Sequence, residues 1–267
     1  MLSIIITSFK EPGTIGRAID SFLSQNIKEK YEITVLAPDK ETQDIVKKYS
    51  KHSKKVRLFK DPGKGKSYAL NLLLPKIRED IIILTDGDVY VSRNSVNDIL
   101  NAFKDKEIGC VTGKPTSIDS KKNIFGYWSH LLLDGIDNTR KLLSSRKEFL
   151  ECSGYLFAIR NGVLQGFPLE ASEDSIIPYL FWKKGYKIKY VPRAEVYVKN
   201  PSNWNDWKLQ KIRNIKGHEN LSKIVKNIPR TKSFFNEIKY GALFALKYPR
   251  NIKQMFFTLT LFAARFY

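Results

Sequence analysis

Short apolar runs alternate with amphipathic stretches along the first 115 residues. Four of these runs have the length of a strand, and they read LSIIIT, EITVLA, VRLF and IIILT. Residues after each run repeat at helical spacing, as Ile15, Ala18, Ile19 and Phe22 do after the first. A further run, IGCVTG, follows the fourth helical stretch. The alternation predicts an α/β fold with right-handed crossovers and a mostly parallel, Rossmann-like sheet that is covered by helices on both faces.

Polar residues cluster directly after the predicted strands. They lie at Ser8–Glu11, Asp39, Asp61–Ser67 and Asp86–Asp88, after the first to the fourth strand in turn. Ligands of such sheets bind at the carboxyl ends of the strands. We therefore expect all four loops to open on the same edge of the sheet.

The pattern changes after residue 115. A long helix is expected over 123–147, and FLECSGYLFAIR has strand character with a break at Ser153-Gly154. A helix should begin near Ser172, and KIKYVP and AEVYV are interpreted as two further strands. From Trp204 onward the pattern is helical, without a strand candidate. The predicted units are residues 1–115 and 116–217, which together make one domain (1–217), and a helical extension over 218–267.

Charge is distributed unevenly between these units. The chain of 267 residues has a formal net charge of +19. Residues 183–267 hold 19 Lys and Arg against 4 Asp and Glu, whereas the rest of the chain is nearly balanced. A solvated surface is one explanation, and an anionic partner such as a membrane surface, a phosphorylated ligand or nucleic acid is the other.

Composition excludes several classes of protein. A hydrophobic fraction of 42% with 12% aromatic residues supports a packed core and argues against disorder. Two cysteines, Cys110 and Cys152, are too few for a disulfide framework or a cysteine-rich metal site. The first apolar run has no basic region ahead of it, so we interpret it as a strand rather than a leader and expect a cytoplasmic protein.

The strongest local motif is Asp86-Gly87-Asp88, which directly follows an apolar strand. Two carboxylates at this spacing can point to one side of the chain, and the intervening glycine lets the backbone approach a ligand. Their mutual repulsion favours a divalent cation, and oxygen ligands suit Mg²⁺ or Mn²⁺. The alternative is an ordinary Asp-Gly turn.

The stretch DPGKGKS contains a Gly-Lys-Ser tail that is typical of a P-loop. A P-loop requires glycine at the position that Lys60 occupies here, so this interpretation is not favoured. A glycine-rich basic turn remains, from which Lys64 or Lys66 could reach a diphosphate.

Ser172-Glu173-Asp174-Ser175 opens a predicted helix. Acidic residues behind a serine cap commonly stabilise the helix dipole. However, Pro178 has no amide hydrogen, so the Asp174 carbonyl loses its helical partner and an irregular start is expected. An irregular helix start is tolerated where a side chain must adopt a particular orientation.

Together these motifs resemble glycosyltransferase family 2, the inverting enzymes of GT-A fold that use nucleotide-diphosphate sugars. The resemblance covers roughly residues 1–217. GKGKSYALN matches the family's Gly-Lys-x-x-Ala-Leu-Asn stretch, and Asp86-Gly87-Asp88 matches its Asp-x-Asp metal motif. Gln210 and Arg213 fit the Gln-x-x-Arg-Trp element of hyaluronan, chitin and cellulose synthases. Asn214 replaces the Trp of that element, which leaves single or processive transfer open.

The resemblance implies a role for each matching residue. It places Asp86 and Asp88 on Mg²⁺ or Mn²⁺, and Asp174, beside Glu173, as the base. It implies an acceptor-binding role for Ser153 and Gly154. Donor-binding residues implied by it are Thr7, Ser8, Glu11, Asp39, Lys66, Asp86, Gln210 and Arg213. The implied ligands are a nucleotide-sugar donor, with a UDP-sugar expected first and GDP-mannose second, and a glycan or lipid-linked acceptor.

The extension 218–267 lies mostly outside the resemblance. An apolar stripe at helical spacing is formed by Phe234, Phe235, Ile238, Ala242 and Ala245. Met255–Ala264 is an apolar run of ten, about half the length that spans a membrane. Such helices can lie on an anionic surface at the cytoplasmic face of the cell membrane, or they can pack on the domain before them.

Two alternatives to an enzyme remain at this stage. A nucleic-acid-binding protein would explain the charge, but it leaves the acidic motifs unexplained and no recognition module is visible, so no nucleic acid is expected. A non-catalytic relative that binds sugar would retain the same fold.

Overall fold

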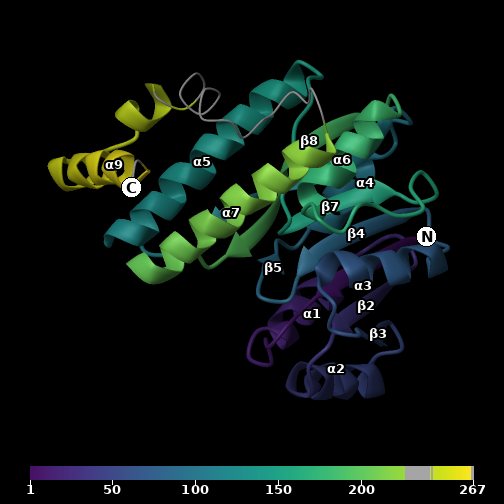
Figure 1. Cartoon of the computed structure of the whole chain (residues 1–267). Helices are drawn as coiled ribbons and strands as arrows, with labels where there is room; N and C mark the ends of the chain where they lie inside the picture. The colour runs from purple at the N-terminus through teal and green to yellow at the C-terminus, as the bar shows by residue number, and fades with distance from the viewer. Residues whose placement is uncertain (226–240, 242, 266–267) are drawn as a thin grey trace.

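The computed structural model describes residues 1–225, 241 and 243–265 (Figure 1). Its strands are β1 (Leu2–Thr7), β2 (Tyr31–Ala37), β3 (Val56–Lys60), β4 (Ile81–Asp86), β5 (Tyr90–Val91), β6 (Ile108–Ser117), β7 (Leu156–Arg160) and β8 (Lys187–Val198). Its helices are α1 (Ile15–Leu23), α2 (Lys40–His52), α3 (Lys66–Leu73), α4 (Ser95–Ala102), α5 (Ile124–Ser145), α6 (Glu173–Lys183), α7 (Trp204–Ile224) and α9 (Ile252–Arg265). Both cysteines are buried and free.

One sheet of eight strands runs through the molecule in the order β3-β2-β1-β4-β7-β6-β8-β5. The first four strands are parallel, as the alternating pattern predicts, and β1 lies between β2 and β4. Their carboxyl ends therefore meet at one edge. Thr7 at the end of β1 pairs in register with Asp86 at the end of β4.

The second half of the sheet departs from a purely parallel arrangement. Strand β7 runs antiparallel between β4 and β6, so the fifth apolar run does not lie beside the fourth. KIKYVP and AEVYV are not two strands but the single strand β8, which follows β6 in parallel with a register shift between Thr112 and Lys114. The shift explains why the hydrophobic pattern is interrupted there, since an irregular register redirects side chains to the opposite face.

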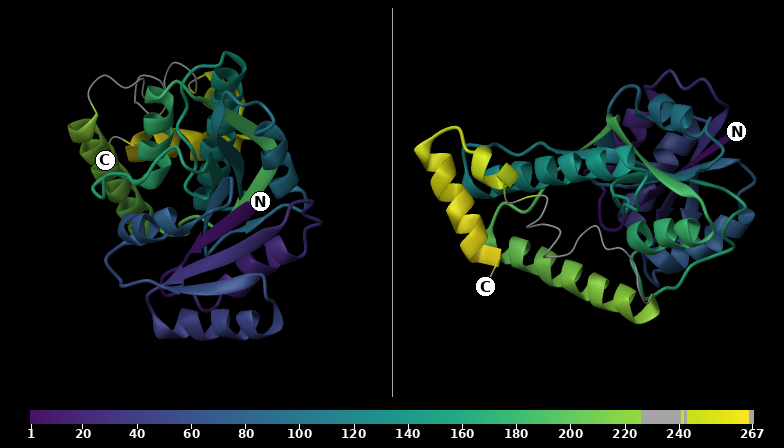
Figure 2. Two further views of the ribbon diagram at one scale, coloured as in Figure 1. Left: turned by 90° about the vertical axis from the view of Figure 1, so that its right-hand side faces the viewer. Right: turned by 90° about the horizontal axis from the view of Figure 1, so that it is seen from above.

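Helices cover both faces of the sheet and enclose two hydrophobic cores (Figure 2). Successive residues of a strand belong alternately to the two cores. In β1, Ile4 and Ile6 pack with α1, α2 and α4, whereas Ile5 packs with α3 and α6. All three isoleucines are fully buried. The continuous apolar runs of the sequence follow from this, because a strand covered on both faces has no polar side.

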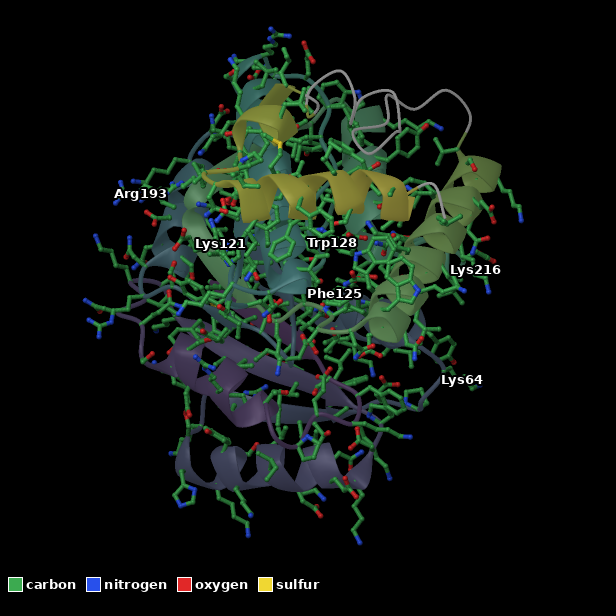
Figure 3. The ribbon with its side chains drawn as sticks, turned by 90° about the vertical axis from the view of Figure 1, so that its left-hand side faces the viewer. Lys64, Lys121, Phe125, Trp128, Arg193 and Lys216 are labelled. Carbon is green, nitrogen blue, oxygen red and sulfur yellow. The ribbon has the colours of Figure 1, made fainter. Side chains whose placement is uncertain are left out.

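A third apolar cluster joins α5, α7 and α9 away from the sheet. Its buried members are Tyr127, Trp128, Leu131, Trp207, Phe257 and Leu261. Phe125 and Trp128 lie beneath α9, whereas Lys64, Arg193 and Lys216 point outward (Figure 3). The indole Nε1 of Trp128 donates to the carbonyl of Phe257 at 2.6 Å. One face of α9 is thus packed on the preceding domain.

The expected extension is only partly described. Of the expected apolar stripe, Phe234, Phe235, Ile238 and Ala242 lie outside the described residues, and Ala245 packs against the third cluster. The expected boundary at residue 217 falls within α7, which continues to Ile224. Among the described helices, none combines the length and the apolar character that crossing a membrane requires.

Candidate active site

Side chains from β1, β4 and α3 meet at the carboxyl edge of the parallel strands. Thr7 Oγ1 donates to Asp86 Oδ1 at 3.0 Å, and Lys66 Nζ donates to the same oxygen at 2.6 Å. Lys66 also pairs with Glu173 Oε1 at 2.5 Å. One lysine therefore links the strand-end carboxylate to the start of α6, across a large separation in sequence.

The position of Lys66 follows from the glycine before it. Gly65 precedes α3 with φ of 97°, a backbone conformation that residues other than glycine rarely adopt. The chain turns there, and Lys66 begins the helix beside Asp86. Burial lowers the pKa of Lys66, but the Asp86 and Glu173 carboxylates outweigh it and raise the pKa overall. Lys64, the other basic residue of this turn, is exposed.

The Asp-Gly-Asp loop packs against the loop after β1. Gly87 donates its amide hydrogen to the Thr7 carbonyl at 2.8 Å. A Cβ at this glycine would lie 2.6 Å from Glu11 Oε2 and would also collide with Ser8. Glycine is therefore required for this close approach.

The carboxylates of Glu11, Asp86 and Asp88 influence one another's charge. Burial is the main cause that raises the pKa of Glu11 to about 7, with the hydrogen bond from Ser8 acting against it and the charges of Asp88 and Asp86 acting in the same direction. Asp88 is an exposed residue, yet partial desolvation of its carboxylate and the Asp86 charge raise its pKa as well. Mutually repelling oxygen donors at a strand end fit Mg²⁺ or Mn²⁺ chemically. Within the described ranges, no three acidic, His or Cys side chains are arranged as a preformed metal cluster.

Asp174 lies at the start of α6 and faces the segment before β7. Its Oδ2 accepts the amide hydrogen of Gly154 at 3.2 Å. Its backbone carbonyl, which Pro178 leaves without a helical donor, accepts the amide hydrogen of Cys152 at 3.1 Å. Ser153 is held by a bond from its amide to Thr112 Oγ1 at 2.9 Å. The irregular start expected from Pro178 thus connects α6 to this segment.

The helix-dipole interpretation accounts poorly for the start of α6. Ser172 makes no side-chain capping hydrogen bond. Glu173 is 6% exposed and pairs with Lys66, whereas residues that merely stabilise a dipole are usually solvated. Burial raises the pKa of Glu173 and Lys66 opposes that effect.

The Asp39 carboxylate accepts hydrogen bonds from two backbone amides. It caps α2 by accepting the amide hydrogen of Thr42 at 3.0 Å, and its other oxygen accepts the Lys10 amide hydrogen at 2.8 Å. Partial burial raises the pKa of Asp39, but these hydrogen bonds lower it overall. Asp39 therefore ties the loop after β2 to the loop that carries Ser8 and Glu11.

Tyr155, which the sequence did not single out, lies among the acidic groups. Burial raises the pKa of its phenol to about 12, and the charges of Asp86, Asp88 and Asp174 contribute in the same direction. Arg213 on α7 acts against them, although Arg213 itself is exposed. Gln210 is half-buried three residues before Arg213 on this helix. Tyr155 thus senses the charges of the strand-end acids, of Asp174 and of Arg213, whereas no described contact joins Gln210 to these groups.

The parallel part of the sheet thus carries carboxylates at its strand ends, beside a basic turn and the acidic start of α6. The family model described as "Glycosyl transferase family 2" matches residues 3–167, more than half of the chain. The chain belongs to this family. The resemblance inferred from the motifs is thereby confirmed.

Curated relatives carry related names. The chain is 25% identical over 233 residues to "Probable glycosyltransferase YdaM" of Bacillus subtilis, with 82% of this chain and 55% of that protein covered. It is 23% identical over 249 residues to poly-beta-1,6-N-acetyl-D-glucosamine synthase of Staphylococcus aureus, with 87% and 58% covered. The chain therefore spans little more than half the length of these relatives.

Solved structures confirm the GT-A fold. A mannosyltransferase, PcManGT from Pyrobaculum calidifontis, in complex with GDP-Man and Mn²⁺, matches with a TM-score of 0.65 at 16% identity, covering 98% of this chain and 74% of that one. A TarS fragment of S. aureus in complex with UDP-GlcNAc matches with a TM-score of 0.56 at 16% identity, covering 97% and 78%.

Proposed function

We propose that this chain transfers a sugar from a nucleotide-diphosphate donor to an acceptor hydroxyl, with inversion at the anomeric carbon. The observation that carries the proposal is the contact of Lys66 with both Asp86 and Glu173. It brings the strand-end acids and the Glu-Asp pair of α6 to one place, as direct displacement between a donor and an acceptor requires.

On the donor side, a metal ion on the strand-end acids and the nearby basic side chains would hold the diphosphate. Asp88, with Asp86 and the adjacent Glu11, would hold Mg²⁺ or Mn²⁺, which when bound neutralises the negative charge that develops on the leaving diphosphate. Lys66 and Arg213 provide further positive charge. Thr7, through its bond to Asp86, fixes the orientation of that carboxylate.

On the acceptor side, Asp174 acts as the general base. An acceptor hydroxyl is a weak acid, so a carboxylate that takes its proton during attack lowers the barrier. The Gly154 amide holds one carboxylate oxygen, which orients Asp174 toward the segment of Ser153 and Gly154. We place the acceptor at this segment.

The first donor to test is a UDP-sugar, and GDP-mannose is the second. The matching TarS fragment was solved with UDP-GlcNAc and the matching mannosyltransferase with GDP-Man and Mn²⁺, which supports both choices. A thermal-shift screen of UDP, GDP, UDP-GlcNAc and GDP-mannose, each with and without Mn²⁺, tests donor binding. A ligand that binds only the folded protein raises its melting temperature. Absence of a shift with all four, in either metal condition, would contradict the proposal.

We further propose that the outer face of α9 lies on an anionic membrane surface and brings the protein to a membrane-proximal or lipid-linked acceptor. Ile252, Met255, Phe256 and Leu259 recur at helical spacing, and all are exposed, Ile252 at 91%. The opposite face, with Phe257 and Leu261, is packed. On α7, Leu209, Ile212 and Ile215 form a similar exposed stripe. Apolar stripes on a strongly basic region fit the headgroup plane of an anionic bilayer.

Vesicle sedimentation tests this surface. The protein should sediment with phosphatidylserine-containing vesicles at low salt, and the double variant Phe256→Ser/Leu259→Ser should lose most of that binding. Leu72→Ser, which changes an exposed apolar residue of α3, is the matched control and should sediment like the wild type. Equal sedimentation of the wild type, the double variant and the control, or no sedimentation of the wild type, would exclude the membrane role.

A further inference from the structure

Helix α3 binds the segment that leads into α6 through two polar side chains. This segment, residues 161–172, connects β7 to α6. Asn71 Nδ2 donates to the Phe167 carbonyl at 2.8 Å, and the Phe167 amide donates to Asn71 Oδ1 at 3.0 Å. Ser67 Oγ donates to the Ala171 carbonyl at 3.4 Å. The last part of the segment is therefore attached to α3 at two points before α6 begins.

These contacts follow one another in opposite order along the two pieces of chain. Ser67 and Asn71 are four residues apart, so their side chains lie on the same face of α3. Starting from the ion pair of Lys66 with Glu173, the contacts step toward the carboxyl end of α3 while they step back along the segment. The segment therefore runs antiparallel to α3 and meets the beginning of that helix where α6 starts.

The two hydrogen bonds at Asn71 form a reciprocal pair. A side-chain amide presents a donor and an acceptor side by side, which match the carbonyl and the amide hydrogen of a single residue. Phe167 is buried, so its backbone groups need partners within the protein. Gly166 lies against the same side chain, since a Cβ there would be 3.1 Å from Asn71 Oδ1. The segment cannot shift at this point without breaking the pair of bonds.

The other end of the segment is attached to a different part of the molecule. Asn161 Nδ2 donates to the Ile77 carbonyl at 2.9 Å, and the Asn161 amide donates to the Asp80 carbonyl at 2.9 Å. These bonds fix where the chain leaves β7, whereas Asn71 fixes where it approaches α6. Asn161 thus makes the same kind of bond as Asn71 without holding the start of α6.

We propose that Asn71 is a positioning residue for Asp174: its bonds to Phe167 fix the end of the segment and thereby the start of α6. Asp174 accepts the Gly154 amide hydrogen with its carboxylate and the Cys152 amide hydrogen with its carbonyl, so its orientation depends on where α6 begins. Because α3 also begins beside the strand-end acids, one helix sets the base relative to the donor. The proposal rests on the proposed function in naming Asp174 the base.

Amide hydrogen exchange, followed by NMR on nitrogen-15-labelled protein, tests the placement without using transfer. In Asn71→Ala, the amides of Cys152 and Gly154 should exchange about tenfold faster or more relative to the amides of β1, because Asp174 no longer holds them in place. Gly166→Ala should speed the same two amides by a smaller factor, since its Cβ displaces the Asn71 side chain. This second, milder variant keeps the test decisive if Asn71→Ala does not fold.

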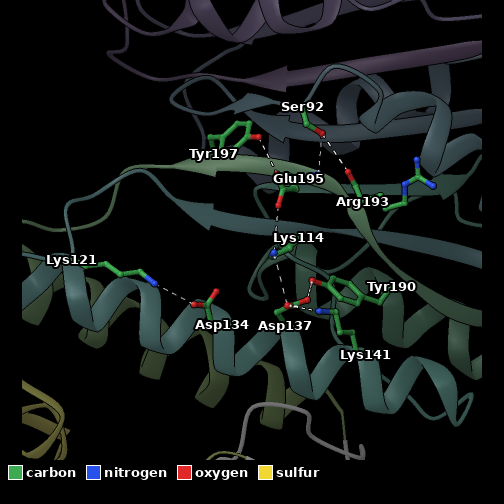
Figure 4. A network of polar contacts seen from close by, with 10 residues as sticks. All are labelled: Ser92, Lys114, Lys121, Asp134, Asp137, Lys141, Tyr190, Arg193, Glu195 and Tyr197. Carbon is green, nitrogen blue, oxygen red and sulfur yellow. Dashed lines mark hydrogen bonds and ion pairs between the residues drawn. The ribbon is translucent and has the colours of Figure 1, made fainter. Parts of the chain in front are cut away.

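Two controls separate positioning from a general loss of stability. Asn161→Ala removes the equivalent side-chain bond at the other end of the segment. Asp134→Ala removes contacts of α5, where Asp134 lies 3.9 Å from Lys121 (Figure 4) and accepts a hydrogen bond from the Tyr248 phenol at 2.6 Å. Between described residues, no hydrogen bond or ion pair joins the network of Figure 4 to α3 or to residues 161–172. Neither control should speed the exchange of the two amides relative to β1.

Kinetics with the donor found in the screen supply a second readout. Asn71→Ala should lower kcat about tenfold or more while the KM for the donor stays within about twofold, because the base is displaced from the acceptor. Asn161→Ala should retain both values.

The proposal would be overturned by unchanged exchange at Cys152 and Gly154 in Gly166→Ala and in any folded Asn71 variant. An equal increase in Asn161→Ala, or a wild-type kcat in Asn71→Ala, would overturn it as well. A wild type that transfers no sugar would contradict the proposed function alone, and the exchange rates would still decide whether Asn71 places Asp174.

Discussion

The acids of the donor half and those of the acceptor half are compensated differently. At the strand ends, burial and the charges of Asp88 and Asp86 raise the pKa of Glu11, and burial and the Asp86 charge raise the pKa of Asp88. No ion pair between described residues includes Glu11 or Asp88. On α6, Glu173 pairs with Lys66, which also contacts Asp86 at the strand ends. The protein thus supplies a lysine to Glu173 and Asp86, whereas Glu11 and Asp88 remain available for an external cation.

This difference agrees with the chemistry proposed for each half. A site that receives a diphosphate with a metal ion must accept added positive charge, so excess carboxylate there is useful. A general base must instead remain ionised without a metal on it, and the hydrogen bond from the Gly154 amide to the Asp174 carboxylate favours the ionised form. Lys66 contacts acids of both halves and so marks the boundary between them.

The largest effect is expected on the acceptor side. Asp174→Asn should fold normally but lose transfer by about 10²–10⁴-fold, since the amide cannot take the acceptor proton. Release of nucleoside diphosphate from the donor found in the screen measures this loss. Asp44→Asn, an exposed carboxylate of α2, is the control and should be fully active. Near-normal transfer by Asp174→Asn would remove Asp174 from the role of base.

On the donor side, the expected effect is on metal binding. Saturating Mn²⁺ should stabilise the wild type by about 2.7 kcal/mol at a hundred times its dissociation constant. Asp88→Asn should lose most of this stabilisation and should also lose transfer, whereas Asp98→Asn should retain both. EDTA should abolish transfer and Mn²⁺ or Mg²⁺ should restore it. Full activity in EDTA would mean that the strand-end acids are compensated in another way.

At the boundary, Lys66→Met should lower the free energy of unfolding by about 1–3 kcal/mol, because Glu173 would remain buried without its cation. Urea unfolding measures this change. Glu173→Gln in the same chain should recover part of the loss, as expected for two residues in direct contact. Lys64→Met, an exposed neighbour, should stay within about 0.5 kcal/mol of the wild type. If the two substitutions were additive, Lys66 would not couple the two halves.

The sequence predicted the donor half of the fold well because its strands are short apolar runs bounded by helical periodicity. The edge shared by Thr7 and Asp86, the helix after Ser172 and the missing helical donor for the Asp174 carbonyl all follow from local patterns. The antiparallel insertion of β7 could not be predicted, because strand neighbours depend on tertiary packing rather than on periodicity.

The details of the site have a similar explanation. The sequence offered Lys64 and Lys66 of the basic turn, and only the turn at Gly65 decides which of them reaches Asp86. Tyr155 could be recognised only when its neighbours from separate elements were known.

The proline inside α6 has a consequence for how this protein can change by mutation. Most helices satisfy their own carbonyls, but here the Asp174 carbonyl accepts an amide from outside the helix. Any residue with an amide hydrogen at position 178 would give that carbonyl a competing donor and weaken its bond to Cys152. A substitution at position 178, in the interior of a helix, can therefore shift the Asp174 carboxylate without contacting it.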